Sequence, residues 1–181
     1  MWSSMSFKMG KKIDLRELDW ADRHRLAELM NNKKIWNNIR DYIPYPYSVS
    51  DAEYFINLVE KDIANKVFAI EFENEFCGVV SLTLKKDIYR KSAEIGYWMG
   101  EPFWGKGIMS EAVRLMIKHG FEEFDLIRIF ARVFENNTAS MRVLEKNGFK
   151  KEGVFKKALV KNGKILDEHR FYILKEDFKF D

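Results

Sequence analysis

The chain has 181 residues, which suits one domain with a well-formed core and is short for two. Hydrophobic residues make up 46% of the sequence, aromatic residues 15% and charged residues 33%, so the composition is that of a globular protein and excludes global disorder. The net charge of +3 is small and the lysines are scattered, which argues against a nucleic-acid-binding protein. We expect a poorly ordered lead-in over residues 1–12 and a single domain over residues 13–178.

The sequence favours a soluble cytoplasmic protein with no membrane partner. The one cysteine, Cys77, cannot form an internal disulfide, the first residues lack the apolar stretch of a signal peptide, and no segment approaches the length of a membrane span. His24, His119 and His169 are scattered without ligand spacing, so we expect no metal site. The sequence leaves open whether the protein is a monomer or a homodimer.

The first part of the chain predicts a strand and two helices, with a proline-containing loop between the helices. Residues 13–18 read as the strand, after which Asp19 can cap a helix that runs to about residue 31. Two prolines in residues 41–47 force an extended loop that displays three tyrosines. A capping-box pair, Ser50 with Glu53, predicts the start of the second helix.

The middle of the chain predicts three strands, a helix and a fourth strand. Residues 67–73 and 76–84 read as a hairpin around Asn74-Glu75, and residues 92–99 as the next strand. An amphipathic helix after Gly107 leads to a strand over residues 127–134. This order is a β-α-β crossover, so the strands on either side of the helix should be parallel.

The last part predicts a short helix and a second hairpin. Asn137 is a good N-cap, Gly148 is a good C-terminal residue, and one short helix fits between them. Asn162-Gly163 is the strongest hairpin signal in the chain, flanked by residues 154–161 and 164–174. The predicted fold class is α/β (α+β): a mixed, mostly antiparallel sheet of six or seven strands, covered by about four helices.

The turn Trp104-Gly105-Lys106-Gly107 lies between a strand and a helix start. Unpaired N–H groups and partial positive charge at a helix start attract anions, and glycines let an anion approach the backbone. The P-loop motif is absent, and the sixth position of a Gly-x-Gly-x-x-Gly pattern would be Ser110. Alone, the turn is either a phosphate site or a simple connection.

The segment Asn137-x-x-Ser140, followed by Gly148-Phe149, supplies the second motif. Together with Gly105-x-Gly107, and with Pro44-x-Pro46-Tyr47 earlier in the chain, it resembles the GNAT superfamily of acyl-CoA-dependent N-acetyltransferases. Within that superfamily the chain is most similar to the branch that acetylates ribosomal-protein N-termini. The resemblance covers roughly residues 13 to 178 and implies a GNAT fold.

The resemblance also implies acetyl-CoA as cofactor and CoA as product. The amides from Gly105 through Ser110 would hold the pyrophosphate, and the strands around Met99 and residue 127 would splay apart so that Met99 pairs with pantetheine. Asn137 would touch the pantetheine arm, while Lys146 and Arg142 are either solvated charges or phosphate ligands. The expected cofactor-binding residues are Met99, Trp104, Gly105, Lys106, Gly107, Ile108, Met109, Ser110, Asn137 and Lys146.

Acetyl transfer to an amine needs a neutral amine, an oxyanion stabiliser and a proton for the departing thiolate. Many family members carry a tyrosine acid late in the second motif, where this chain has Leu144. We expect Ser140 to replace it, with an ordinary surface serine as the alternative. Glu94 is the candidate base because it lies in an apolar strand before the cofactor turn. Its alternative role is an ion pair with a residue such as Arg132.

No Ser-His-Asp or Cys-His arrangement stands out in the sequence, so we expect direct attack of the amine on acetyl-CoA. The early loop offers the candidate substrate-binding residues Trp36, Tyr42, Tyr45 and Tyr47, some of which must instead pack in the core. These aromatics suit the N-terminal α-amine of a protein or peptide. A small amine such as a drug, polyamine or metabolite is the alternative acceptor, and a non-catalytic acyl-CoA-binding module is the alternative function.

Overall fold

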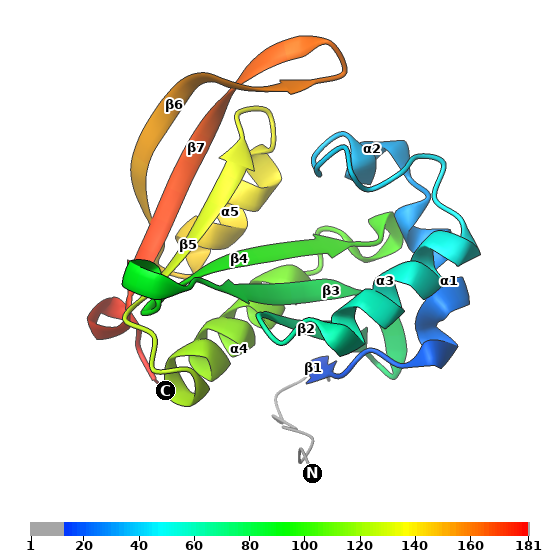
Figure 1. Cartoon of the computed structure of the whole chain (residues 1–181), viewed down its shortest axis with the longest axis horizontal. Coiled ribbons are helices and arrows are strands. Elements are labelled where there is room, and N and C mark those ends of the chain that lie inside the picture. Colours follow the sequence, from blue (N-terminus) through cyan, green and yellow to red (C-terminus); the bar gives the residue numbers. More distant parts are fainter. Residues whose placement is uncertain (1–12, 181) are drawn as a thin grey trace.

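The computed structural model describes residues 13–180, so the expected lead-in over residues 1–12 lies outside the described residues. Seven strands form one sheet with the order β1-β2-β3-β4-β5-β7-β6 (Figure 1). The strands are β1 (Ile13–Arg16), β2 (Asn65–Phe72), β3 (Glu75–Leu84), β4 (Ser92–Met99), β5 (Arg128–Phe134), β6 (Lys150–Lys161) and β7 (Lys164–Leu174). Only β4 and β5 pair in parallel, so the predicted mixed, mostly antiparallel sheet is confirmed.

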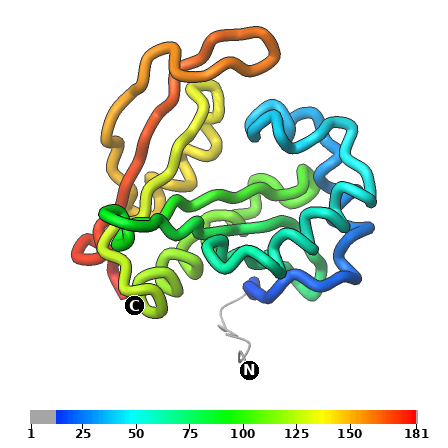
Figure 2. The backbone as a smooth tube through the Cα atoms, viewed as in Figure 1, coloured from blue at the N-terminus to red at the C-terminus, as the bar shows by residue number. Residues whose placement is uncertain are grey.

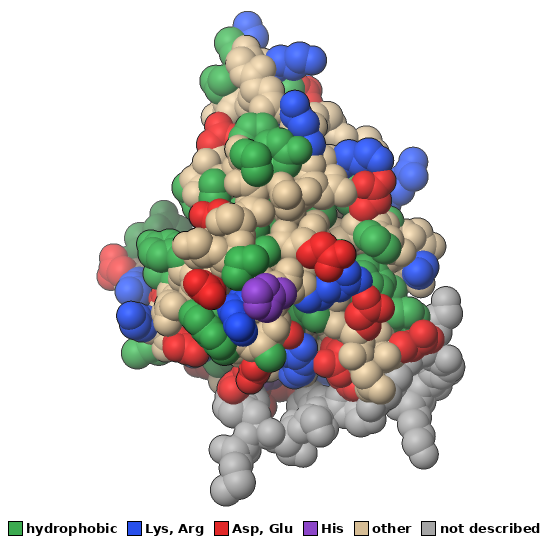
Figure 3. Space-filling view, turned by 90° about the vertical axis from the view of Figure 1, so that its right-hand side faces the viewer, with side chains coloured by type: hydrophobic (Ala, Val, Ile, Leu, Met, Phe, Trp, Pro, Cys, Tyr) green, Lys and Arg blue, Asp and Glu red, His purple; other side chains and the backbone are tan. Residues whose placement is uncertain are grey.

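Five α-helices accompany the sheet over the described residues. They are α1 (Arg23–Met30), α2 (Lys33–Trp36), α3 (Val49–Lys61), α4 (Ile108–Glu123) and α5 (Thr138–Lys146). Short 3-10 turns cover Trp20–Asp22, Asp87–Tyr89, Glu101–Phe103 and Lys175–Asp177. Helix α1 packs against α3 and β3, whereas α4 packs against β1, β3 and α5. Figure 3 looks onto the side that carries α1 and α3, where basic and acidic side chains are intermixed.

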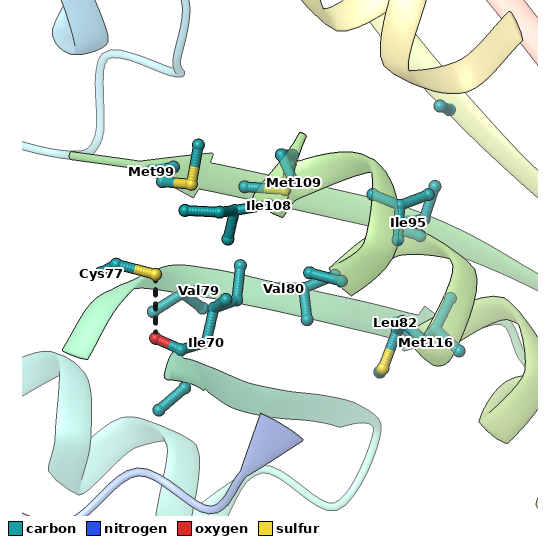
Figure 4. Close-up of a cluster of buried hydrophobic side chains, with 14 of the residues drawn as sticks. Ile70, Cys77, Val79, Val80, Leu82, Ile95, Met99, Ile108, Met109 and Met116 are labelled. Carbon is teal, nitrogen blue, oxygen red and sulfur yellow. Dashed lines mark hydrogen bonds between the residues drawn. The ribbon is translucent and has the colours of Figure 1, made fainter. Parts of the chain in front are cut away.

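A large part of the core lies between α4 and the central strands (Figure 4), and helices α1 and α3 contribute further buried residues such as Leu26 and Ala52. Alternate residues of a strand point to opposite faces, and on β3 Val80 and Leu82 are fully buried toward the core. The Cys77 thiol is also fully buried and donates to the carbonyl of Ile70 at 3.3 Å. Burial raises the pKa of Cys77 to about 12, so this residue behaves as a packed hydrophobe, as the sequence predicted.

Strands β4 and β5 pair over only three residues each. Ser92, Ala93 and Glu94 lie opposite residues 128–130, although β4 continues to Met99 and β5 to Phe134. Beyond that point the two strands diverge, which is clear in the tube view (Figure 2). Strand β5 remains paired with β7 along its whole length, so the opening separates two halves of the sheet. The splay that the family resemblance implied is therefore present.

Three local predictions can be compared with the structure. The hairpin between β6 and β7 turns at Asn162 and Gly163, both with positive φ, as predicted. The first hairpin turns at Glu73-Asn74, one residue earlier than predicted, because these two residues adopt the left-handed conformation. The capping box of α3 is Ser48 with Asp51, two residues earlier than predicted, so the Ser50–Glu53 prediction was wrong. Two overlapping Ser-x-x-acid patterns fit the sequence equally well.

Candidate active site

Two helices begin beside the opening between β4 and β5. Because α4 follows the end of β4 and α5 follows the end of β5, the divergence of the strands sets the two helix starts on either side of the opening. The N-cap of α4 is Gly107, with a φ of 79°, and Gly105 has a φ of 74°. Nothing lies within 4 Å of the Cβ position of either glycine. No side chain caps the first turn of α4, and the space beside its N-cap is open, as an anion site requires.

The other expected cofactor-binding residues differ in what they offer. Met99, Ile108 and Met109 are buried, which leaves mainly their backbone groups for a ligand. The Trp104 indole donates to the Met99 carbonyl at 2.7 Å, so this carbonyl already has one partner. The Lys106 ammonium lies 5.6 Å from the centre of the Phe103 ring and remains exposed.

The start of α4 is also tied to the end of α5. The side-chain amide of Asn147 donates to the carbonyl of Ser110 at 3.0 Å and to that of Val143 at 2.9 Å. The bond to the Ser110 carbonyl fixes the first turn of α4 relative to the end of α5. Lys146, the neighbour of Asn147, is exposed on the surface of α5.

Ser140 lies in the first turn of α5 and faces Tyr97 of β4 across the opening. The side chain of Asn137 caps the helix by accepting from the Ser140 amide at 3.2 Å, as predicted for an N-cap. The Tyr97 hydroxyl lies 2.9 Å from Ser140 Oγ, where either atom can be the donor, and 3.2 Å from the Ser140 carbonyl, which can accept from it. Burial raises the pKa of Tyr97, with a smaller opposing effect from the Ser140 hydrogen bond, so the phenol stays protonated at neutral pH.

Sequence reasoning missed Tyr97, although a signal was available. Tyr97 lies on the strand before the glycine turn, and the same position made Glu94 a candidate. The face that Tyr97 occupies otherwise carries the buried residues Ala93, Ile95 and Met99, so its polar tip needs a partner. Leu144, where many family members carry a tyrosine acid, is fully buried in the core.

Glu94 is held by three cations. Arg132 donates to both of its carboxylate oxygens, at 2.8 and 2.7 Å, while Lys85 donates at 2.9 Å and Arg40 at 3.1 Å. Burial alone would raise the pKa of Glu94, but the hydrogen bonds from Arg132 and Lys85 outweigh burial and lower it. The ion pair with Arg132, which was the alternative role for Glu94, is thus the observed arrangement.

A cleft of about 560 Å³ connects the early loop with the opening in the sheet. Tyr42 and Tyr47 line one part of it, and Tyr97, Asn137 and Ser140 line another. Residues of α3 that the sequence did not suggest, among them Tyr54, Phe55 and Leu58, complete the wall next to the loop. The cleft therefore brings predicted substrate-binding residues and Ser140 into one space.

Trp36 and Tyr45 do not line this cleft. Their rings contact each other with centroids 5.6 Å apart, and the Trp36 indole donates to the Ile43 carbonyl at 2.9 Å. The Lys161 ammonium lies 3.6 Å from the centre of the Trp36 ring. Both aromatics thus build the loop that carries Tyr42 and Tyr47. Such a division of roles depends on side-chain directions that a loop sequence does not define.

No described helix combines the length and apolarity needed to cross a membrane. Among the described residues, no group of three or more His, Cys, Asp or Glu side chains is placed to hold a metal ion.

Known proteins provide an independent comparison. The chain is 31% identical to an uncharacterized N-acetyltransferase, YnaD, of Bacillus subtilis, over 93% of this chain and 96% of that protein. It is 29% identical to the ribosomal-protein-serine acetyltransferase of Escherichia coli, over 84% and 87% of the two chains. A crystal structure of spermidine N-acetyltransferase from Vibrio cholerae, in complex with CoA and spermine, superposes with a TM-score of 0.78 at 26% identity, covering 91% of this chain and 96% of that one.

A family model agrees with these comparisons. The model described as an acetyltransferase (GNAT) domain matches residues 12–150, which include the opening between β4 and β5, the glycine turn before α4 and the whole of α5. The chain belongs to the GNAT family of acetyltransferases.

Proposed function

We propose that this GNAT N-acetyltransferase transfers the acetyl group of acetyl-CoA to the N-terminal α-amine of a protein or peptide, by direct attack of the amine. The observation that carries the proposal is the cleft, because it joins an aromatic loop and helix α3 to Ser140 at the opening in the sheet. An extended N-terminus can lie along such a groove with its amine at the opening. The relative named as a ribosomal-protein-serine acetyltransferase supports this choice of acceptor.

The residues around the opening suit acetyl-CoA, which supplies an activated acetyl group as a thioester. The uncapped first-turn amides at Gly107 and beyond can hold the pyrophosphate, and the Lys106 ammonium lies beside them as a mobile cation. The divergence of β4 from β5 leaves backbone groups of residues 95–99 without a neighbouring parallel strand. These groups can pair with the amides of an extended ligand, whereas Lys146 can reach a phosphate only from the surface.

Ser140 is the proposed acid. When the amine displaces the thiolate, the nitrogen loses a proton and the sulfur gains one; a hydroxyl at the opening can donate to the sulfur and be reprotonated by the proton that the amine releases. The Tyr97 hydroxyl has a single proton, so it donates either to the Ser140 carbonyl or to Ser140 Oγ. In the second case the Ser140 hydroxyl proton is free to point into the cleft. Tyr97 therefore acts as the positioning residue for Ser140.

A base role for Glu94 stays a prediction, and its surroundings favour a positioning role. Its carboxylate already accepts four hydrogen bonds from Arg132, Lys85 and Arg40. A carboxylate with a lowered pKa is a weak base, and the amine needs little help because an α-amine has a reference pKa of about 8. We propose that Glu94 holds the three cations in place.

A small cationic amine is the second candidate acceptor, because the chain also resembles a spermidine N-acetyltransferase in fold. Polyamine recognition requires several available carboxylates. The cleft is lined by three carboxylates, and each has partners: Glu94 is held by cations, Asp51 caps α3, and Asp62 binds the amide of Ala64. The cleft chemistry therefore favours the peptide.

The experiment is an acceptor panel assayed by thiol release from acetyl-CoA, with the product mapped by mass spectrometry. Peptides with a free N-terminus should be acetylated at the α-amine, and the same peptides with a blocked N-terminus should not react. Efficient reaction with spermidine or other small amines, but with no peptide, would contradict the proposal. Two further predictions remain: a single domain over residues 13–178 and a cytoplasmic location. Light scattering of the purified protein distinguishes a monomer from a homodimer.

A further inference from the structure

The cations around Glu94 outnumber the carboxylate that they share. Arg40, Lys85 and Arg132 all donate to Glu94, so the cluster of four side chains carries two positive charges in excess. All four side chains line the cleft that also contains Ser140. The part of the candidate acceptor site around Glu94 is thus locally positive.

The excess is local to this cluster. Two further carboxylates line the cleft, Asp51, which accepts from Ser48, and Asp62, which accepts from Ala64, so the cleft lining as a whole carries three cations and three carboxylates.

Asp41, next to Arg40, is bonded to the buried ammonium of Lys161 at 2.6 Å. Glu168 of β7 accepts from Arg170 at 2.8 Å, although its charge also attracts Arg132. Together these pairs add no net negative charge to the cluster.

Arg40 is the member of the cluster best placed to meet a ligand. Its side chain is 53% exposed, against 28% for Lys85 and 32% for Arg132. It makes one hydrogen bond to Glu94, at 3.1 Å, whereas Arg132 makes two shorter ones. Arg40 can therefore turn toward an incoming anion while Arg132 and Lys85 keep Glu94 paired.

Arg40 and Arg132 also line a second hollow, of about 270 Å³, beside the cleft. Lys161 and other residues of the β6–β7 hairpin also line this hollow, together with the carboxylates of Asp41 and Glu168. An acceptor whose amine lies near Ser140 thus has two arginines within the same connected surface. Guanidinium groups bind carboxylates with paired N–H donors, which makes them selective for such a group.

We propose that the acceptor is a peptide N-terminus with an acidic side chain at its second or third residue, and that Arg40 binds this side chain. The inference rests on the proposed function and names its substrate class. Positive charge at the site attracts such a peptide and opposes one with basic residues at the same positions. The charge of the peptide side chains next to the amine then determines which acceptors the enzyme prefers.

The test uses three peptides that differ only at residues two and three, which are acidic (Asp-Glu), neutral (Asn-Gln) or basic (Arg-Arg). Arginine is chosen because it adds no second reactive amine. For the wild-type protein, kcat/KM should be roughly tenfold higher for the acidic than for the neutral peptide, which equals about 1.4 kcal/mol, and lower still for the basic one. The preference should weaken at high salt.

Two variants assign the effect to Arg40. Arg40→Gln should lower the acidic preference to about twofold or less, mainly through KM. Lys86 supplies the control, because it is exposed, follows Lys85 and does not line the cleft. Lys86→Gln should keep the full preference for the acidic peptide.

The possible failures are distinguishable. Equal kcat/KM for all three peptides would overturn the acidic-acceptor inference and leave peptide acetylation intact. Acetylation of small amines with no reaction on any peptide would overturn the proposed function itself. If Arg40→Gln kept the full preference for the acidic peptide, Arg40 would not be the residue that binds the acidic side chain.

Discussion

The ammonium of Lys161, at the tip of the β6–β7 hairpin, lies 2.6 Å from the carboxylate of Asp41 in the early loop. The Lys161 side chain is only 4% exposed, whereas that of Asp41 is 64% exposed. A neighbouring bond, from the Asn162 side chain to that of Asn37 at 2.9 Å, joins the same two segments. The hairpin is thereby fixed to the segment that carries Arg40 and Tyr42, so β6 and β7 help to shape the cleft proposed as the acceptor site.

In the pair of Asp41 and Lys161, removing the carboxylate should lower the stability of the protein more than removing the ammonium. Asp41→Asn leaves a buried lysine without its counter-charge, and we expect it to lower the free energy of unfolding by about 1–3 kcal/mol. Lys161→Met keeps the length of the side chain over Trp36 and should cost less. Urea unfolding at neutral pH measures both variants. Lys164→Met, an exposed change on the same hairpin, should leave stability unchanged.

The opposite order of effects would contradict this account. If Lys161→Met were the more damaging change, the contact between the ammonium and the Trp36 ring would matter more than the ion pair.

The hydroxyl of Ser140 should affect turnover and leave cofactor binding unchanged. We expect Ser140→Ala to lower kcat about a hundredfold, the lower end for loss of a general acid, while calorimetry shows an unchanged affinity for acetyl-CoA. Tyr97→Phe should have a smaller effect, since it removes only the group that orients the serine. Ser140→Thr keeps a hydroxyl and serves as the control. Full turnover of Ser140→Ala would mean that water protonates the thiolate.

The fold was largely predictable because its signals are local. Glycine and asparagine at positive φ mark turns and helix starts by their own conformational preferences, as at Gly107 and Gly163. Alternation in residues 92–99 and the helix that follows were enough to predict a parallel pair. The divergence of this pair after Glu94 was expected only from the family resemblance, because no local preference encodes where two strands separate.

The site was less predictable because its groups meet over long sequence distances. Arg40, Lys85 and Arg132 come from a loop, a strand end and another strand, and only Arg132 was considered as a partner of Glu94. The contact of Tyr97 with Ser140 likewise joins β4 to α5 across the opening. A sequence pattern places residues on an element, whereas these contacts depend on how whole elements pack.

Charge at the N-cap of α4 should control cofactor affinity. Gly107→Ala introduces strain of about 1–2 kcal/mol at a positive φ, but it leaves the first-turn amides open. Gly107→Asp adds a carboxylate that caps these amides and repels phosphate. We expect acetyl-CoA to bind at least tenfold more weakly to Gly107→Asp than to Gly107→Ala.

Thermal unfolding of the same two variants separates binding from folding. An aspartate cap stabilises a helix start and tolerates a positive φ better than alanine, so Gly107→Asp should be no less stable than Gly107→Ala. Equal acetyl-CoA affinities would show that the turn does not hold the pyrophosphate.

Glu94 should stabilise the fold in a pH-dependent way. A carboxylate whose pKa is lowered by folding stabilises the protein above its unfolded pKa, about 4.3 for glutamate, and this contribution is lost as the pH falls through the lowered folded value. The difference in unfolding free energy between wild type and Glu94→Gln should therefore be largest at neutral pH and shrink below about pH 4. A difference that stays constant down to pH 3 would contradict the ion-pair account.

The pH dependence of catalysis should follow the acceptor's amine. Because its pKa is lowered, Glu94 stays ionised throughout pH 6 to 9 and contributes no titration there. The rise of kcat/KM in that range should instead shift with the pKa of the acceptor's α-amine, near 8 for an ordinary N-terminus. Peptides that differ only in the basicity of their N-terminus measure this shift. Glu94→Gln should keep the rise at the same pH, whereas its disappearance in this variant would assign the base to Glu94.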